Sequence, residues 1–259
     1  LIEFIKDADA AVVGTEIMTE NVLNHAPRLK IISKYGVGLD NIDKELLERH
    51  SIFLGWTGGV NRRSVAELTL CFMLGLCRNI FAAGFKLKQS TWEKNGGYQL
   101  TGKTIGIIGC GYTGSEVIRL LGPFQCNLLV CDIVDKSQFC KEENAIELPL
   151  EDVIARSNII SIHVPLTSRT KEMVNTNFLA QMKSNAFLIN TSRGGVVDQQ
   201  ALKESLKANR IAGAALDVFS EEPPNDQEFL GLPNLMVTPH IAGNAQESIE
   251  AMGRSAINH

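Results

Sequence analysis

Short runs of apolar residues, separated by polar and glycine-rich segments, recur along the whole chain. Such runs are typical of strands that are buried on both faces of a parallel sheet. Segments of helical periodicity stand between them, so the pattern predicts an α/β fold built by strand–helix alternation. We expect strands over residues 10–13, 29–33, 52–55, 104–109, 127–131, 158–164, 186–191, 211–219 and 235–237. We expect helices over residues 18–26, 43–50, 65–83, 115–121, 150–156, 176–182, 198–208 and from 245 onward.

The segment 65–83 is apolar almost all round, which is typical of a helix that is buried on most of its faces. We expect it to lie between domains or in a subunit interface. Ser64 is its predicted N-cap, because Glu67 follows three residues later and completes a capping box. Residues 86–100 are polar and are expected to form a loop, with Trp92 as an anchor.

One glycine-rich turn follows the apolar run 104–109 and reads Gly109-Cys-Gly111-Tyr-Thr-Gly114. Gly109 allows a tight turn, Gly111 leaves room for a phosphate beside the backbone, and Gly114 lets the next helix approach the strand. The helix N-terminus offers unpaired N–H groups to an anion. Asp132 ends the following apolar run, 18 residues after Gly114, where a ribose-binding acid is expected. The spacing favours a dinucleotide site over a plain turn between strand and helix.

Polar candidates stand just past the ends of the predicted strands, at the edge where open α/β sheets bind ligands. They are Asp132, His163, Arg193, Asp217 and His240. Arg193 precedes two glycines, and its planar guanidinium suits a carboxylate or a 2-oxo acid better than a surface ion pair. Arg62 and Arg63 are either solvated surface charges or residues that bind an anionic substrate tail.

Glu222 and His240 are weak signals when each is considered alone. Together they form a candidate pair, in which the carboxylate fixes the imidazole tautomer and the imidazole acts as general acid and base. Asp217 is either an acceptor for a nicotinamide carboxamide or a helix cap. His163 is expected to be a loop residue packed by Pro165, with at most an orienting role.

Composition and net charge argue against some classes of partner. The 259 residues are 44% hydrophobic and 21% charged, as in ordinary globular proteins with room for two domains. The formal net charge of −4 argues against nucleic acid and anionic membranes as partners, and no apolar run is long enough to span a bilayer.

The six cysteines form no Cys-x-x-Cys pair, so we expect reduced thiols in a cytoplasmic protein and no metal site. The chain begins with Leu1 and stops within a helical pattern, and we expect both natural ends to be missing.

Several ordered motifs resemble those of the D-isomer-specific 2-hydroxyacid dehydrogenases, and most closely the phosphoglycerate dehydrogenase-like branch. The resemblance runs from about residue 12 to the end. Besides the glycine turn, it rests on Gly36-Val-Gly-Leu-Asp-Asn-Ile-Asp43, Ser64-Val-Ala-Glu67, His163-Val-Pro-Leu-Thr167, Asn190-Thr-Ser-Arg-Gly-Gly-Val-Val-Asp198, Gly213-Ala-Ala-Leu-Asp-Val-Phe219 with Glu222-Pro223, and Thr238-Pro-His240.

The resemblance implies two doubly wound parallel-sheet domains with the active site in the cleft between them. Residues 61–241 would form a Rossmann domain that binds NAD, inserted into a flavodoxin-like substrate domain of residues 1–60 and 242–259. The family also implies homodimers, to whose interface the helix of residues 65–83 would contribute. The implied reaction is hydride transfer between the nicotinamide and C2 of a small 2-hydroxy or 2-oxo acid, phosphoglycerate or a related acid.

The resemblance also implies roles for individual residues. Arg193 would bind the substrate carboxylate and carbonyl, His240 would be the acid/base, and Glu222 would orient it. The expected cofactor contacts are Gly109, Gly111, Tyr112, Thr113, Gly114, Asp132, His163, Pro165, Thr170, Thr191, Asp217 and Gly243. The expected substrate contacts are Lys34, Val37, Gly38 and Arg193, with Val37 and Gly38 presenting backbone N–H groups to the carboxylate.

The chain departs from the family pattern at two positions. Tyr112 stands where Arg is common in the family, so one pyrophosphate contact is either lost or supplied by another group. Gly14 replaces one of two basic residues that hold the phosphate of phosphoglycerate, and only Lys34 remains. Two other functions stay open: an NAD(H)-sensing corepressor-like protein without turnover, and a preference for NADP, which Asp132 argues against because its carboxylate repels a 2′-phosphate.

Overall fold

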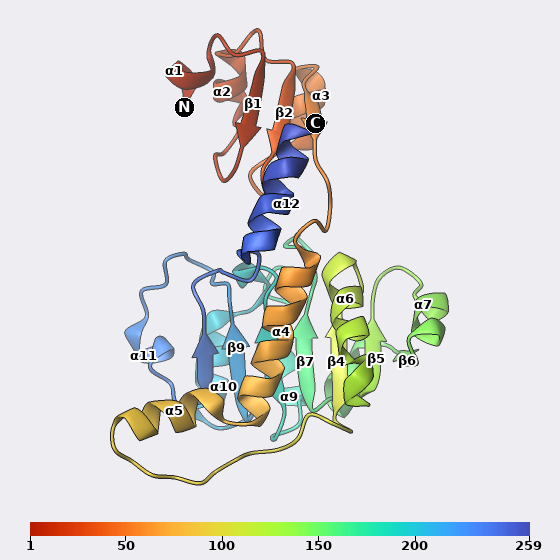
Figure 1. The fold of residues 1–259 in the computed structure, drawn as a ribbon, viewed down its shortest axis with the longest axis vertical. Helices are drawn as coiled ribbons and strands as arrows, with labels where there is room; N and C mark the ends of the chain where they lie inside the picture. Colours follow the sequence, from red (N-terminus) through yellow and green to blue (C-terminus); the bar gives the residue numbers. More distant parts are fainter. The chain divides into compact units, whose positions relative to one another are not determined.

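The computed structural model describes residues 1–259, which divide into two compact units. The first unit comprises Leu1–Ser64 and Gly243–His259, and the second comprises Val65–Ala242. Both contain a parallel sheet with helices in the connections between strands, as the alternating pattern predicts (Figure 1).

The first unit holds a three-stranded parallel sheet in the order β1-β2-β3. Its elements are α1 (Ile2–Ile5), β1 (Ala10–Val13), α2 (Glu20–Asn24), β2 (Ile31–Lys34), α3 (Lys44–Arg49), β3 (Phe53–Gly55) and α12 (Gln246–Ile257). Thr19 and Asp43 cap the N-termini of α2 and α3 with their side-chain oxygens. The last helix, α12, packs against the central strand, and the hydroxyl of Ser33 donates to the carbonyl of Ala256 at 2.6 Å.

The second unit holds a seven-stranded parallel sheet in the order β10-β9-β8-β7-β4-β5-β6. Its strands are β4 (Thr104–Ile108), β5 (Asn127–Cys131), β6 (Ala145–Glu147), β7 (Ile159–Ile162), β8 (Phe187–Asn190), β9 (Gly213–Leu216) and β10 (Leu235–Val237). Its helices are α4 (Arg62–Cys77, beginning just before the unit boundary), α5 (Ile80–Lys88), α6 (Tyr112–Leu121), α7 (Ser137–Glu142), α8 (Leu150–Arg156), α9 (Thr176–Gln181), α10 (Gln199–Lys207) and α11 (Gln227–Leu230), with 3₁₀ turns η1 (Gly122–Phe124) and η2 (Gly194–Val196).

Strand β4 lies between β5 and β7, so the strand order reverses at β4. Connections leave neighbouring strands in opposite directions at such a point, which opens a crevice at the carboxyl ends of the strands. The glycine turn predicted to bind a dinucleotide follows β4 directly and therefore lies at this switch point.

Two apolar cores cover the two faces of this sheet. On one face, residues of α4 and α6 such as Phe72 and Ile118 pack on Ile105 and Ile107 of β4 (Figure 1). On the other face, residues of α8, α9 and α10 pack on Ile160 and Ile162 of β7. The central strands are buried on both faces, which explains why they read as unbroken apolar runs.

The expectation of one helix over residues 65–83 is wrong. The structure has two helices, α4 and α5, bent by 64° at a break around Asn79. Asn79 adopts a left-handed conformation with φ 53°, which Asn tolerates better than most residues. Half of α4 is buried, whereas α5 has no buried residue. No single helix is long and apolar enough to cross a membrane. Only α4 and α5 taken together have the length and apolar composition of a membrane span, and they are bent at the break between them.

The predicted N-cap role of Ser64 is also wrong. The amide of Arg62 already donates to the carbonyl of Gly59, so the helix begins two residues before Ser64. The Ser64 hydroxyl accepts instead from the amide of Ala245 at 3.3 Å. Elsewhere the structure shifts boundaries: α6 begins at Tyr112 rather than at residue 115, and α5 extends into the segment expected to be a loop.

Candidate active site

The three glycines of the turn after β4 each have a steric reason. Gly109 has φ 92°, and a Cβ there would lie 2.6 Å from the carbonyl oxygen of His163. A Cβ at Gly114 would lie 2.1 Å from the carbonyl oxygen of Gly109. At Gly111, by contrast, a Cβ would meet open space. The turn therefore packs closely on its inner side and leaves an open approach at Gly111, as a phosphate-binding turn requires.

The N-terminus of α6 fits a pyrophosphate. Its N-cap is Gly111, and no side chain caps the helix, so the first-turn amides stay available to an anion. Tyr112 is 58% exposed at the first position of this helix. A pocket beside the turn is lined by Cys110, Gly111, Tyr112, Ser115, Arg119, Lys136 and Phe139. Arg119 and Lys136 bring positive charge to this pocket, and Arg119 also pairs with Glu143 at 3.2 Å.

Asp132 lies beside the glycine turn, as the sequence spacing predicts. Its Oδ2 accepts from the amide of Cys110 at 2.6 Å, and its Oδ1 accepts from the amide of Val134 at 2.9 Å. A carboxylate offers about four acceptor positions, so two remain for the hydroxyls of a ribose. The hydrogen bonds within the chain hold the carboxylate in place for such a contact.

His163 directly follows β7, and its backbone packs against Gly109 of the glycine turn. Its Nε2 is 2.8 Å from the hydroxyl of Ser161, and its Nδ1 is buried without a hydrogen-bond partner. Burial lowers the pKa of His163 to about 4. The imidazole is therefore neutral at physiological pH, and the orienting role expected for His163 stays a prediction.

Two threonines shape the neighbouring strand ends. The Thr170 hydroxyl donates to the carbonyl of Pro165 at 2.5 Å and accepts from the amide of Thr167 at 2.8 Å, which closes the loop after β7. The Thr191 hydroxyl lies 2.9 Å from that of Thr69 on α4. Both predicted cofactor contacts thus belong to well-defined turns at the ligand-binding edge of the sheet.

Asn190, the last residue of β8, shapes the turn that carries Arg193. Its side chain is fully buried; Nδ2 donates to the carbonyl of Arg193 at 2.9 Å, and Oδ1 accepts from the amide and hydroxyl of Ser192 at 3.0 and 2.8 Å. The guanidinium of Arg193 donates to the carbonyl of Ser192 at 2.7 Å. Because both ends of the Asn190 amide are engaged, the backbone of Arg193 has one defined orientation.

Asp217 follows β9 and is fully buried. Its carboxylate accepts from the hydroxyl of Thr238 at 2.5 Å and from the amides of Ile241 and Ala242, both at 2.8 Å. Its backbone carbonyl accepts from the amide of His240 at 2.8 Å. Asp217 therefore fixes the turn that carries His240, a role that sequence reasoning missed when it assigned Asp217 to the cofactor or to a helix cap.

The structure brings Glu222 and His240 together. Glu222 Oε2 lies 2.7 Å from His240 Nδ1, and Glu222 Oε1 accepts from the amide of Phe219 at 3.0 Å. A carboxylate accepts but does not donate, so the proton of the pair is on Nδ1, and any proton exchange with a ligand takes place at Nε2. The His240 side chain is 51% exposed, so a ligand can reach it.

Close backbone packing joins the turn of Arg193 to the loop of Glu222. A Cβ at Gly194 would lie 1.8 Å from the carbonyl carbon of Phe219, the residue whose amide holds Glu222. Only glycine fits this contact. The sequence signal for this contact is the glycine pair after Arg193, of which Gly194 serves packing inside the chain.

Four predicted site residues belong to the first unit. The ammonium group of Lys34, which is buried, donates to the carbonyl of Gly14. Val37 and Gly38 lie in the loop after β2, and a Cβ at Gly243 would lie 2.8 Å from Nδ2 of Asn61. The pKa of the Glu16 carboxyl is lowered, first by a hydrogen bond from its own backbone amide and then by one from the amide of Gly14, and the nearby charge of Lys34 adds to this effect.

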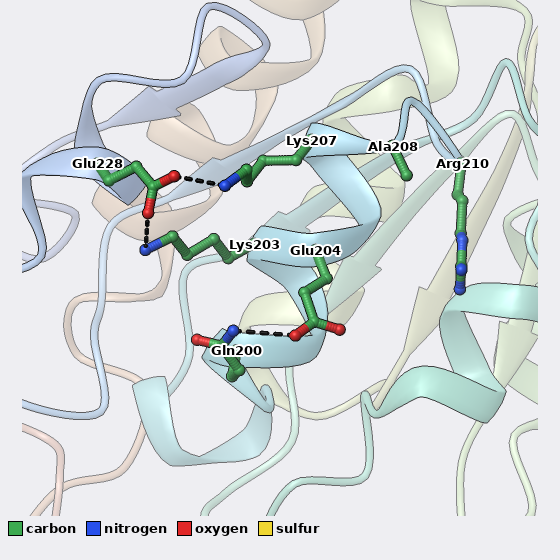
Figure 2. Close-up of a pocket in the computed structure, with 7 residues that line it drawn as sticks. All are labelled: Gln200, Lys203, Glu204, Lys207, Ala208, Arg210 and Glu228. Atoms are coloured by element: carbon green, nitrogen blue, oxygen red, sulfur yellow. Dashed lines mark hydrogen bonds and ion pairs between the residues drawn. The ribbon is translucent and has the colours of Figure 1, made fainter.

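A second surface pocket lies on α10 and α11, away from the strand ends (Figure 2). Figure 2 shows Glu228 between the ammonium groups of Lys203 and Lys207, with both of which it forms ion pairs. Lys203 also pairs with Asp226 at 2.8 Å, and these hydrogen bonds raise the pKa of Lys203. The network ties α10 to α11, and it presents no residue of the candidate active site.

The chain is similar to one family of dehydrogenases. Residues 70–242 match the model of the D-isomer specific 2-hydroxyacid dehydrogenase, NAD binding domain. D-3-phosphoglycerate dehydrogenase from Methanocaldococcus jannaschii is 39% identical over 98% of this chain, which spans 49% of that protein. Glyoxylate reductase from Pyrococcus furiosus is 38% identical over 97% of this chain and 78% of its own length. The crystal structure of D-lactate dehydrogenase from Aquifex aeolicus, complexed with NAD and lactic acid, matches with a TM-score of 0.90 and 28% identity, over 100% of this chain and 83% of that one.

Gly194→Ala tests the backbone contact between the Arg193 turn and the Glu222 loop. The added Cβ overlaps the Phe219 backbone, so we expect the free energy of unfolding in urea to fall by about 1–3 kcal/mol. Gly84→Ala is the control, because this glycine lies inside α5 and a Cβ there meets open space. Equal stability of the two variants would show that the contact at Gly194 can relax.

His163 predicts a pH dependence of stability. Its pKa is about 4 in the folded chain and about 6.5 in the unfolded chain, so the unfolded state binds more protons between these values. This contribution is present at pH 7 and is lost as the pH falls, by about 2 kcal/mol at pH 5. Between pH 7 and pH 5, we expect the free energy of unfolding in urea to fall by about 2 kcal/mol less in His163→Gln than in the parent. Identical pH dependence in variant and parent would contradict a neutral, buried His163.

Proposed function

The chain belongs to the D-isomer specific 2-hydroxyacid dehydrogenase family, and from this premise we propose that it is an NAD-dependent dehydrogenase that interconverts a small 2-hydroxy acid and its 2-oxo acid. The expected family, α/β fold class and cofactor, NAD, are confirmed at the family level. One observation carries the proposed reaction: the 2.7 Å contact between Glu222 and His240, at the same strand edge as Arg193 and the glycine turn.

Arg193 is proposed to bind the substrate carboxylate and to polarise the carbonyl through its guanidinium. The glycine turn and Asp132 would hold NADH, which would supply the hydride that reduces the carbonyl carbon, C2, of the 2-oxo acid. His240, protonated on both nitrogens, donates the proton on Nε2 to the carbonyl oxygen, and the product is the 2-hydroxy acid. Glu222 holds the Nδ1 proton throughout, so that the imidazole exchanges only its Nε2 proton.

The cofactor contacts proposed from the family motifs are supported by the geometry of the second unit. The open glycine turn, the uncapped N-terminus of α6 and the carboxylate of Asp132 suit the pyrophosphate and ribose of NAD. Ile133 is 96% exposed after Asp132, so the segment offers no cation at this position to a 2′-phosphate. A lower KM for NADPH than for NADH would contradict this preference.

The substrate side chain is the less defined part of the proposal. The relatives are named for phosphoglycerate and glyoxylate. Lys34 remains a proposed contact for an anionic tail, but its ammonium group donates to the carbonyl of Gly14. Phosphoglycerate-like acids and small acids such as glyoxylate therefore both stay in the proposed substrate class.

An NADH oxidation assay with phosphohydroxypyruvate, hydroxypyruvate, glyoxylate and pyruvate tests the reaction. We expect turnover with at least one acid, and a kcat about 10²–10⁴-fold lower for His240→Gln, because the general acid is lost. Glu222→Gln should also lower kcat, while both variants should bind NADH as the parent does. Tight NADH binding without turnover on any acid would favour the second candidate, a corepressor-like NAD(H) sensor.

We further propose a homodimer in the cytoplasm. The free state of all six cysteines supports a reducing compartment. The apolar side chains Ile80, Phe81, Phe85 and Leu87 of α5 are each more than half exposed, which supports an interface that covers this helix. Sedimentation equilibrium should give a dimer for the parent and a monomer for the double variant Phe81→Ser with Phe85→Ser. A monomeric parent would overturn the dimer.

A further inference from the structure

The loop after β2 presents a row of backbone donors without partners inside the chain. The N–H groups of Gly36, Val37 and Gly38 form no hydrogen bond with other backbone groups, and the three residues lie outside every helix and strand. Gly36 has φ 98°, which turns the chain sharply at the strand end. All three residues are only partly exposed. Half-buried N–H groups of this kind normally have a partner, so the loop is suited to bind an anion.

Trp56 holds this loop from the neighbouring strand. It follows β3, which pairs with β2, and its indole Nε1 donates to the carbonyl of Val37 at 3.1 Å. The ammonium group of Lys44 lies 5.4 Å from the centroid of the Trp56 ring, and such a cation–π contact favours one ring orientation. Trp56 is therefore a well-placed donor with one defined acceptor.

The bond to Val37 also sets the direction of the next amide. The carbonyl of Val37 and the N–H of Gly38 belong to the same planar trans peptide unit, in which they point in opposite directions. A donor that fixes the carbonyl therefore fixes the N–H as well. We propose that Trp56 is a positioning residue, which aims the Gly38 N–H at the carboxylate of the 2-oxo acid substrate.

This inference rests on the proposed function, because it needs a 2-oxo acid substrate, and the family resemblance implies that Val37 and Gly38 present backbone N–H groups to the carboxylate of that acid. It adds a specific cause for their orientation. The carboxylate is bound equally in the ground state and in the transition state, so loss of the Trp56 bond should weaken substrate binding without slowing the chemical step.

The test compares Trp56→Phe with Trp92→Phe, because the chain has two tryptophans and Trp92 is 72% exposed in the other unit. Phe keeps an aromatic ring for Lys44 but removes the indole donor. We expect Trp56→Phe to raise KM for the 2-oxo acid about two- to tenfold, as expected for one hydrogen bond, with kcat and the Kd of NADH unchanged. Trp92→Phe should match the parent in all three quantities.

A second measurement does not depend on the stability of Trp56→Phe. In the Trp92→Phe variant, Trp56 gives the single indole N–H resonance in a ¹H–¹⁵N spectrum. We expect this resonance to shift when oxamate, an unreactive carboxylate analogue, is titrated into the NADH-saturated protein. A resonance that stays in place while calorimetry shows oxamate binding would overturn the proposal.

The remaining outcomes separate the two proposals. If the parent turns over a 2-oxo acid and Trp56→Phe has the same KM as Trp92→Phe, the positioning role is wrong and the proposed function stands. A fall in kcat or a weaker Kd for NADH in Trp56→Phe would show a general structural role instead. If the parent neither turns over nor binds any acid, the proposed function fails, and the positioning role fails with it.

Discussion

The buried carboxylate of Asp217 is the interaction on which the candidate site most depends. Three donors from the segment 238–242 converge on it, and its backbone carbonyl accepts from the amide of His240. A buried carboxylate without such donors would be strongly unfavourable. The charge of Asp217 is therefore stable only when the segment 238–242 forms this turn, and the turn is held by its hydrogen bonds to Asp217. The amide of Asp217 also donates to the carbonyl of Asn190 at 3.0 Å. The turn that carries His240 is thereby set in register with the strand end that leads to Arg193.

Close backbone contacts at two glycines fix the relative positions of further loops at this edge of the sheet. Gly194 packs against the Phe219 backbone, and Gly109 packs against the carbonyl of His163. Each contact joins loops that follow different strands, and each is too short for any side chain. The positions of Arg193, Glu222 and the glycine turn therefore follow from packing within the sheet edge rather than from a ligand. Such preorganisation is what an electrostatic site needs before its substrate arrives.

The sequence predicted most strands and the glycine turn, because buried parallel strands are unbroken apolar runs and glycines mark tight turns. It also placed Asp132 beside that turn, since the spacing follows from the length of one helix and one strand. It failed at Asn79, because a single left-handed residue interrupts an apolar pattern without changing it. The contacts of Asp217, Asn190 and Trp56 were missed for another reason. They join residues from different strand ends, and no local pattern records which polar group accepts which hydrogen bond.

Two histidines at the same edge show why residue type alone does not assign chemistry. His163 and His240 both stand near the ends of predicted strands, and in the sequence only the candidate partner Glu222 distinguishes His240. His163 is partly buried, its Nδ1 is buried without a hydrogen-bond partner, and desolvation lowers its pKa to about 4. Its imidazole is therefore neutral near pH 7 and lacks the imidazolium form that acts as a general acid. His240 is half exposed and has Glu222 on one nitrogen, so the other nitrogen can exchange a proton with a ligand while the tautomer stays fixed. The difference arises from the loops that carry the two histidines. The loop after β7 packs the backbone of His163 against Gly109, whereas His240 lies on a turn that is held by hydrogen bonds to Asp217.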